Sequence, residues 1–230
     1  MARVVTTLEA FRSVARDAPS GVRIPVEVRL EVTDPFLAYR RARDDDGGAI
    51  LETTGGQSGW GYFGVDPVER LTVGPDAVAR SDGSPTLAAL EGLLAGERLV
   101  RGACSIPYPC GAIGWLSYDV ARELEELPGS ADDDRGLARL EVAVYDRLAA
   151  WKEPRDGETT LRIAACPRLE NDPERAYERG KERALELVER IREGDRSVGE
   201  PPTTAATATF ESDCGREAFA DRVRTVKESI

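Results

Sequence analysis

The chain has 230 residues and carries 42 acidic against 31 basic side chains, which gives a formal net charge of -11, and it contains no histidine. Without histidine there is no Ser-His-Asp or Cys-His relay and no imidazole metal site. The excess of negative charge, with no basic block, argues against nucleic-acid binding. A hydrophobic content of 41% suffices for one large domain or two modest ones.

The predicted elements mix strands and helices. In the first part of the chain, the patterns predict a helix at 6–18, a strand at 24–32, a helix at 35–43 and strands at 48–53 and 60–65. A hairpin of 71–73 with 77–79, a helix at 86–96, and a strand at 107–119 that runs into a helix at 120–127 are predicted next. The last predicted elements are strands at 140–151 and 160–166, paired around the turn 154–157, a helix at 173–193, and a helix from about residue 215. The expected helix caps are Thr6 or Thr7, Asp34 and Asp172. The first strand alternates apolar and charged residues, so we expect it to have one solvated face.

Strands and helices follow one another without a strict β-α-β alternation. This order predicts an α+β fold with mostly antiparallel sheets and flanking helices. The segment 197–209 is rich in Pro, Thr and Ala, which is typical of a linker. We therefore expect one domain over 1–196, a linker over 197–209, and the beginning of a further domain at 210–230.

The unpaired cysteines and the lack of a signal peptide or membrane span predict a cytoplasmic protein. No two of the four cysteines have C-x-x-C spacing, so we expect free thiols at Cys104, Cys110, Cys166 and Cys214. There is no apolar core of signal-peptide length and no run of about 18 apolar residues, so we expect no membrane association. The acidic triplets 44–46 and 132–134 fit a solvated surface suited to concentrated salt, because adjacent carboxylates on a loop diverge rather than converge on a metal.

Glu52 is the first candidate for a binding residue. It ends a predicted strand beside the glycine-rich loop 54–59, where a partly desolvated carboxylate could receive the ammonium group of a small ligand; the alternative is an ordinary surface acid. The loop lacks the Lys-Ser/Thr of a phosphate-binding loop, which favours a flexible hairpin. Trp60 and Tyr62 are expected in the core rather than in a ligand cage. Cys110 has no base nearby and is not expected to be a nucleophile.

Several segments resemble the chorismate-utilising amination enzymes, namely component I of anthranilate synthase and of aminodeoxychorismate (para-aminobenzoate) synthase. Ile50-Leu51-Glu52-Thr53 is similar to the Leu-Leu-Glu-Ser element of that family, and residues 60–67 resemble its Tyr-Ser-Phe-x-Gly-x-Asp-Pro strand. Residues 109–119 resemble its Gly-Gly-Ala-x-Gly-x-x-x-Tyr-Asp segment, and residues 144–147 its Phe-Asp strand. Order and spacing agree over nearly the whole chain, and the acid-rich composition suggests a haloarchaeal-like member.

The resemblance implies an N-terminal domain, with 210–230 as the truncated start of the C-terminal chorismate-binding domain. In this family chorismate, Mg²⁺ and the catalytic histidine and acidic residues belong to the C-terminal half. We therefore expect no catalytic residue, metal or cofactor in this chain, and Mg²⁺ and chorismate only in the full-length enzyme. The expected partner is the glutamine amidotransferase subunit, component II, which supplies ammonia.

The resemblance also implies a pocket for L-tryptophan, which is a feedback inhibitor in anthranilate synthases and a structural ligand in some aminobenzoate synthases. Glu52 and Thr53 match the Glu-Ser of that pocket, and the region of the Arg-Tyr-Ser that lines it is occupied by Gln57, Ser58, Gly59 and Trp60. Thr53 stands in place of the family's serine, and Gly59 where the family usually has arginine. Both changes weaken the case for tryptophan feedback, which favours the aminobenzoate branch.

Three interpretations remain open at this stage. The first is the non-catalytic N-terminal part of aminodeoxychorismate synthase component I, whose complete form aminates chorismate for para-aminobenzoate and folate synthesis. The alternative is the corresponding part of anthranilate synthase component I, in tryptophan biosynthesis. An alternative of another class is a stand-alone amino-acid-binding or interaction module without catalysis.

Overall fold

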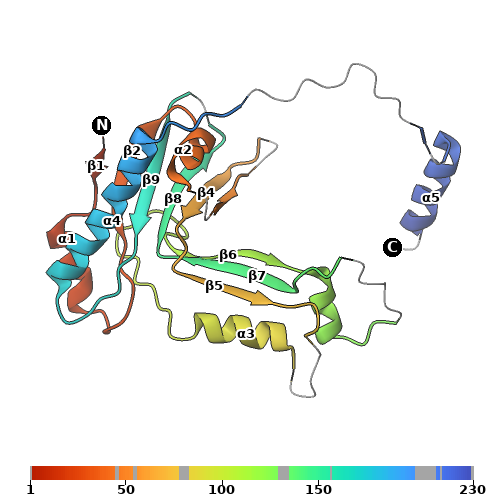
Figure 1. Cartoon of the computed structure of the whole chain (residues 1–230), viewed down its shortest axis with the longest axis horizontal. Coiled ribbons are helices and arrows are strands. Elements are labelled where there is room, and N and C mark those ends of the chain that lie inside the picture. The colour runs from red at the N-terminus through yellow and green to blue at the C-terminus, as the bar shows by residue number, and fades with distance from the viewer. Residues whose placement is uncertain are drawn as a thin grey trace. The chain divides into compact units, whose positions relative to one another are not determined.

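Two antiparallel sheets and their flanking helices form the larger part of the structure, which confirms the predicted α+β class (Figure 1). The computed structural model describes residues 2–44, 47–53, 56–77, 83–128, 135–155, 157–199, 211–212 and 214–228. Contacts group the chain into two units, Met1–Val198 and Gly199–Ile230. Most of the predicted linker, the acidic triplet 132–134 and two residues of the triplet 44–46 lie outside the described residues.

The larger sheet has six strands in the order β1-β2-β9-β8-β4-β3, all antiparallel. Its strands are β1 (Arg3–Val4), β2 (Val26–Val32), β3 (Gly48–Leu51), β4 (Gly59–Val65), β8 (Arg147–Glu153) and β9 (Thr159–Ala165). Three helices pack on this sheet: α1 (Leu8–Arg16), α2 (Pro35–Ala42) and α4 (Pro173–Glu193) (Figure 1). The main core lies between them, where Phe63 and Trp151 from the sheet pack with Leu187 of α4.

The smaller sheet has three strands in the order β5-β7-β6. They are β5 (Glu69–Val73), β6 (Gly111–Leu116) and β7 (Leu140–Tyr145), and the helix α3 (Pro85–Leu94) contacts β5 (Figure 1). The predicted hairpin of 71–73 with 77–79 is not tested in full, because residues 78–79 lie outside the described part; residues 71–73 pair with β7. In the second unit, the helix α5 (Arg216–Glu228) has no buried residue.

The helix starts follow the capping residues in the sequence. Thr7, Asp34 and Asp172 each accept backbone N–H groups of the first helical turn, at distances between 3.0 and 3.3 Å. Such caps satisfy donors that have no partner within the helix. The predicted starts of α1, α2 and α4 are therefore confirmed, with Thr7 rather than Thr6 as the first cap.

Residues 140–151, predicted as one strand, are two strands in different sheets. β7 belongs to the smaller sheet and β8 to the larger one, and the chain passes between them at Asp146. The segment that joins β4 to β5 also crosses from the larger sheet to the smaller one, at Asp66, a non-glycine residue with φ of 54°. Apolar patterning could not show this division, because both strands are buried and share the same period.

The buried side chain of Arg147 links the β4–β5 connection to helix α4 at this corner. Its side chain is 1% exposed and donates to Asp66 Oδ2 at 2.7 Å, to Glu186 Oε2 at 3.0 Å and to the carbonyl oxygen of Arg183 at 2.7 Å. Arg190 makes a second ion pair with Asp66. The Asp-Pro and Tyr-Asp-Arg segments that carry the family resemblance thus meet at the junction of the sheets and helix α4.

The helix predicted at 120–127 is a short 3-10 helix, η1 (Tyr118–Glu123). Its last residue reaches α3, where the Glu123 carboxylate accepts from the hydroxyls of Ser84 at 2.6 Å and Thr86 at 2.7 Å. Beyond it, Leu124 and Leu127 are exposed. A short helix needs tertiary packing to persist, and side chains as exposed as these contribute little of it to a further turn.

The solvated face predicted for the first strand is only partly solvated. Glu27 in β2 is 3% exposed and its carboxylate pairs with Arg29 at 2.7 Å. Its side chain faces the segment 101–104, since Glu27 lines a small cavity together with Arg101, Gly102 and Cys104, and its carboxylate lies 4.0 Å from the Arg162 guanidinium. The alternation therefore identified the strand correctly but not what lies over its polar face.

Candidate functional site

The six residues predicted for an amino-acid pocket lie around the connection between β3 and β4. They are Glu52 and Thr53 after β3, Gln57 and Ser58 before β4, and Gly59 and Trp60 as the first two residues of β4. The Thr53 hydroxyl donates to the carbonyl oxygen of Trp60 at 3.3 Å, which ties the two ends of the connection together. Gln57 and Ser58 are exposed. Residues 54–55 lie outside the described part of the chain.

Gly59 has no space for a side chain. A Cβ atom at this position would lie 2.6 Å from Thr53 Oγ1 and 3.2 Å from Thr53 Cγ2. The two departures from the family pattern are therefore in direct contact, since Thr53 fills the space in which a side chain at position 59 would begin. The closest contact is to Oγ1, an atom that a serine would also carry, so the two departures are neighbours but neither requires the other.

Glu52 belongs to a cluster of three carboxylates around Arg155. The Arg155 guanidinium lies 3.0 Å from Asp34 Oδ1, 3.2 Å from Glu153 Oε1 and 3.7 Å from Glu52 Oε1. The indole N–H of Trp151 also donates to Glu153, at 2.6 Å. One cation among three anions leaves a net negative charge, and the Glu52 side chain is 36% exposed at its edge. A ligand ammonium group would offset part of this excess negative charge.

Trp60 lies on the opposite side of the sheet from the helical core. Its ring is partly buried next to Ile106 and stacks on Tyr62 with the ring centroids 6.4 Å apart. The guanidinium carbon of Arg162 and the ammonium nitrogen of Lys152 are 5.5 and 5.8 Å from its ring centroid. These are packing and cation–π contacts within the chain. They agree with the expectation that the aromatic residues of this strand serve the core.

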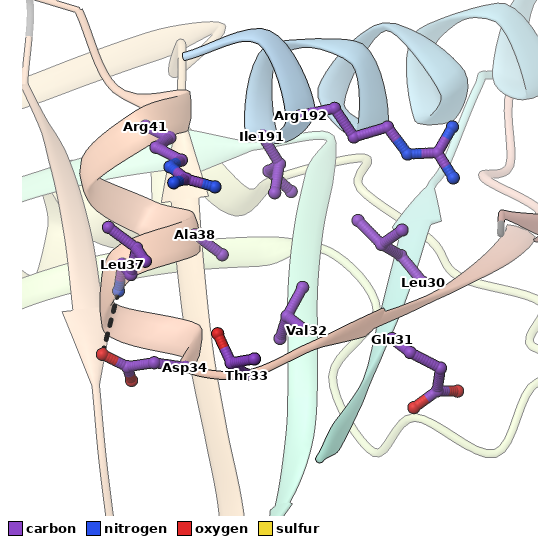
Figure 2. A pocket seen from close by; sticks show the side chains of 10 residues that line it. All are labelled: Leu30, Glu31, Val32, Thr33, Asp34, Leu37, Ala38, Arg41, Ile191 and Arg192. Carbon is purple, nitrogen blue, oxygen red and sulfur yellow. Dashed lines mark hydrogen bonds between the residues drawn. The ribbon is translucent and has the colours of Figure 1, made fainter. Parts of the chain in front are cut away.

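A cavity of about 330 Å³ shares Asp34 with the Arg155 cluster (Figure 2). Figure 2 shows Glu31 and Asp34 on one side and Arg41 and Arg192 on the other, with apolar side chains such as Val32 between them. The two arginines lie in the last turns of α2 and α4, where cations complement the helix dipole. Opposed charges across an apolar floor also suit a zwitterion with an apolar side chain. None of the six predicted pocket residues lines this cavity.

Sequence reasoning missed Arg155, Asp34 and Glu153 as neighbours of Glu52. Arg155 belongs to the β8–β9 turn and Asp34 was identified only as a helix cap. Nothing in their local sequence indicates proximity to Glu52, because it arises from the order of strands in the sheet.

Neither a metal centre nor a membrane span is found in the described ranges. Among these residues, no group of three or more Cys, Asp or Glu side chains is arranged to hold a metal ion. No helix of the described segments combines the length and the apolar character needed to cross a membrane.

Comparison with known proteins finds relatives that share one name. No protein-family model matches the chain. A curated protein of Haloarcula marismortui named anthranilate synthase component 1 1 is 60% identical over 232 residues, which is 100% of this chain and 46% of that protein. This chain is homologous to part of anthranilate synthase component 1. The family resemblance read from the motifs, including its haloarchaeal character, is thereby confirmed.

Other proteins named anthranilate synthase component 1 also match most of this chain with less than half of their own length. A second Haloarcula marismortui protein, anthranilate synthase component 1 3, is 53% identical over 99% of this chain and 46% of its own length. The Mycolicibacterium smegmatis protein is 29% identical over 89% of this chain and 40% of its own length. The chain therefore spans about half the length of the curated relatives that it matches. Their names support the anthranilate branch better than the aminobenzoate branch that the sequence analysis favoured.

Proposed function

We propose that this chain is the non-catalytic N-terminal part of an anthranilate synthase component 1. The observation that carries the proposal is the 60% identity, over the whole chain, to a protein of that name. The complete enzyme would aminate chorismate with ammonia delivered by a glutamine amidotransferase subunit. Chorismate, Mg²⁺ and the catalytic groups would belong to the half of the relatives that this chain does not cover. No catalytic residue is assigned to the present chain.

The departures at the Glu52 connection do not argue for the aminobenzoate branch. Thr53 and Gly59 touch each other and reshape a region that would bind a regulator. The position at which the ring is aminated would be set where chorismate binds, in the other half. A change in the regulatory region can alter feedback without altering the reaction, so the names of the relatives carry more weight for the branch.

We further propose that Glu52 receives the ammonium group of an amino acid, with L-tryptophan as the first candidate. The three carboxylates around Arg155 supply the negative charge, and Glu52 is the member farthest from the guanidinium, at 3.7 Å. It is therefore the carboxylate with the weakest hold on Arg155 and the most available to a ligand.

The branch is tested by genetic complementation. The gene that encodes this chain, with whatever coding sequence continues it, is introduced into a haloarchaeal tryptophan auxotroph and into a para-aminobenzoate auxotroph, each with its amidotransferase partner. We expect growth without tryptophan. Rescue of only the para-aminobenzoate auxotroph would show that the aminobenzoate branch is correct. The 230-residue chain by itself should not convert chorismate with ammonia and Mg²⁺.

The pocket is tested by titration calorimetry of the purified chain with L-tryptophan. We expect binding that is lost in Glu52→Ala and kept in Glu189→Ala, which removes an exposed acid from the surface of α4. Loss in Arg192→Ala with binding kept in Glu52→Ala would place the ligand in the cavity of Figure 2 instead. Absence of binding in the wild-type chain, with the fold confirmed by circular dichroism, would show that the amino-acid pocket is vestigial.

A further inference from the structure

Two cysteines far apart in the sequence meet at the corner between the sheets. β6 and β9 pair with the continuous chain of β7 and β8, with Gly111 opposite Tyr145 and Ala165 opposite Arg147. One residue further along each register, Cys110 and Cys166 both fall opposite Asp146. On the other edge of the β7–β8 segment, β8 pairs with β4 and β7 pairs with β5. The strands β6 and β9 therefore approach each other along one edge of this segment.

Hydrogen bonds confirm that the two cysteines converge. The Cys166 backbone N–H donates to the Asp146 carbonyl oxygen at 2.7 Å, and the Cys166 thiol donates to the carbonyl oxygen of Pro109, the residue before Cys110, at 3.5 Å. The Arg23 guanidinium holds the same segment through the Cys166 carbonyl oxygen at 3.0 Å. Cys166 is thus held by contacts with three different parts of the chain, namely two backbone carbonyl oxygens and one arginine side chain.

The two thiols have different acidities and different access to solvent. The neighbouring Cys166 thiol, which could donate its proton to the Cys110 thiolate instead of to Pro109, lowers the pKa of Cys110 against the effect of burial, and the positive charge of Arg23 lowers this pKa further. Burial raises the pKa of Cys166 well above its ordinary value. Cys110 lines a cavity of about 130 Å³ together with Arg23 and Glu97, whereas Cys166 is 1% exposed. A molecule of the size of water or hydrogen peroxide fits such a cavity.

We propose that Cys110 and Cys166 form an oxidisable dithiol that closes to a disulfide when a hydroperoxide enters the cavity at Cys110. This role departs from the expectation that Cys110 is not a nucleophile, because the fold brings Arg23 and Cys166 to it. The Cys110 thiolate attacks one peroxide oxygen, so that an S–O bond forms and the O–O bond breaks; for hydrogen peroxide, the released hydroxide takes up a proton to give water. The Cys166 thiol then loses its proton and its sulfur attacks the Cys110 sulfenic sulfur. An S–S bond forms, the S–O bond breaks, and a second water leaves.

This bond would join the ends of β6 and β9, and therefore the two sheets, across the corner that Arg147 also stabilises. It closes a loop that includes β6, β7, β8 and β9. Because a disulfide restricts the unfolded chain, the oxidised protein should be more stable. The site needs no residue of the proposed tryptophan pocket, so its test is independent of the proposed function.

The test uses the full chain treated with hydrogen peroxide, followed by mass spectrometry without reduction. We expect the intact mass to fall by two hydrogens and proteolysis to release one linked pair of peptides containing Cys110 and Cys166. A dithiol reductant should restore the mass. A bridge that involves Cys104 or Cys214, or oxygen added to sulfur without any bridge, would refute the proposal. This measurement needs no variant and so does not depend on the folding of one.

Variants then separate the roles of the two thiols. In Cys166→Ala, Cys110 should stop at the sulfenic acid, which a 1,3-dione reagent traps, whereas the matched control Cys104→Ala should form the bridge as the wild type does. The oxidised wild type should show a Tm higher by roughly 10 °C. If the bridge forms but Tm stays the same or falls, the bond does not fit the native corner and that part of the proposal is wrong.

Discussion

Replacing Arg147 by methionine tests whether the buried guanidinium holds the two sheets and α4 together. The wild-type side chain is 1% exposed and has three oxygen acceptors within 3.0 Å. Methionine keeps most of the apolar contact but leaves Asp66, Glu186 and the Arg183 carbonyl without this donor. The variant therefore removes the charge and the hydrogen bonds while it changes the packing little.

The expected loss of unfolding free energy in Arg147→Met depends on how exposed the carboxylates paired with Arg147 are. Removing one member of a fully buried ion pair costs about 3–5 kcal/mol. Here Asp66 is 32% and Glu186 53% exposed, so water can solvate both carboxylates in the variant, and Arg190 still pairs with Asp66. In the described part of the chain, Arg147 Nε is also buried without a partner, which offsets some of the gain. We expect a loss of about 2 kcal/mol, between the buried and the surface limits.

The assay is urea unfolding of the wild type, Arg147→Met and the control Arg12→Met. Arg12 pairs with Glu174 on the surface, where its side chain is half exposed, so its loss should cost less than about 1 kcal/mol. Added salt should reduce the loss of unfolding free energy caused by Arg12→Met more than the loss caused by Arg147→Met, because salt screens buried ion pairs less. Equal stability of Arg147→Met and Arg12→Met, or a stabilised Arg147→Met, would refute the idea that this network holds the corner.

Two further changes probe the core and the α3 cap. Gly61→Ala would place a Cβ atom 2.1 Å from Trp151 Cε2, so we expect urea unfolding to show a loss of about 1–3 kcal/mol, while Gly92→Ala, in open space on α3, should be neutral or stabilising. Burial raises the pKa of Glu123, but hydrogen bonds from Ser84 and neighbouring donors outweigh this and lower it overall. The ionised Glu123 carboxylate therefore stabilises the folded state fully above the unfolded-state pKa of Glu, and this stabilisation is lost as the pH falls through the lower folded-state pKa. Acid titration of unfolding should therefore be steeper below about pH 4.5 for the wild type than for Glu123→Gln; parallel curves would contradict this.

Elements whose signals are local were predictable from the sequence. The caps at Thr7, Asp34 and Asp172 mark the three helices on the larger sheet, and alternation marks β2, because these signals act within one turn or between adjacent residues. The family motifs around Glu52 were equally visible. The 3-10 helix at 118–123 was not, because its end depends on a carboxylate bound to a helix more than thirty residues earlier.

The candidate site was predictable only in its first residues. Glu52 and Thr53 were identified by their motif, and contact between Thr53 and the start of β4 follows from a hairpin. The position of Arg155 beside Glu52 depends on β4 pairing with β8, which brings together residues about a hundred positions apart. No periodicity in one sequence reports such a pairing.

The sequence by itself determined the class of the protein, its helix caps and its family, since composition, local hydrogen bonding and short motifs are properties of neighbouring residues. Only the tertiary structure decided that one predicted strand serves two sheets, that Arg147 is buried at their junction, and that Cys110 meets Cys166. These features depend on which strands pair and in which register. Strand pairing and register depend on which arrangement buries the apolar side chains of the whole core, so no single segment of the sequence encodes them.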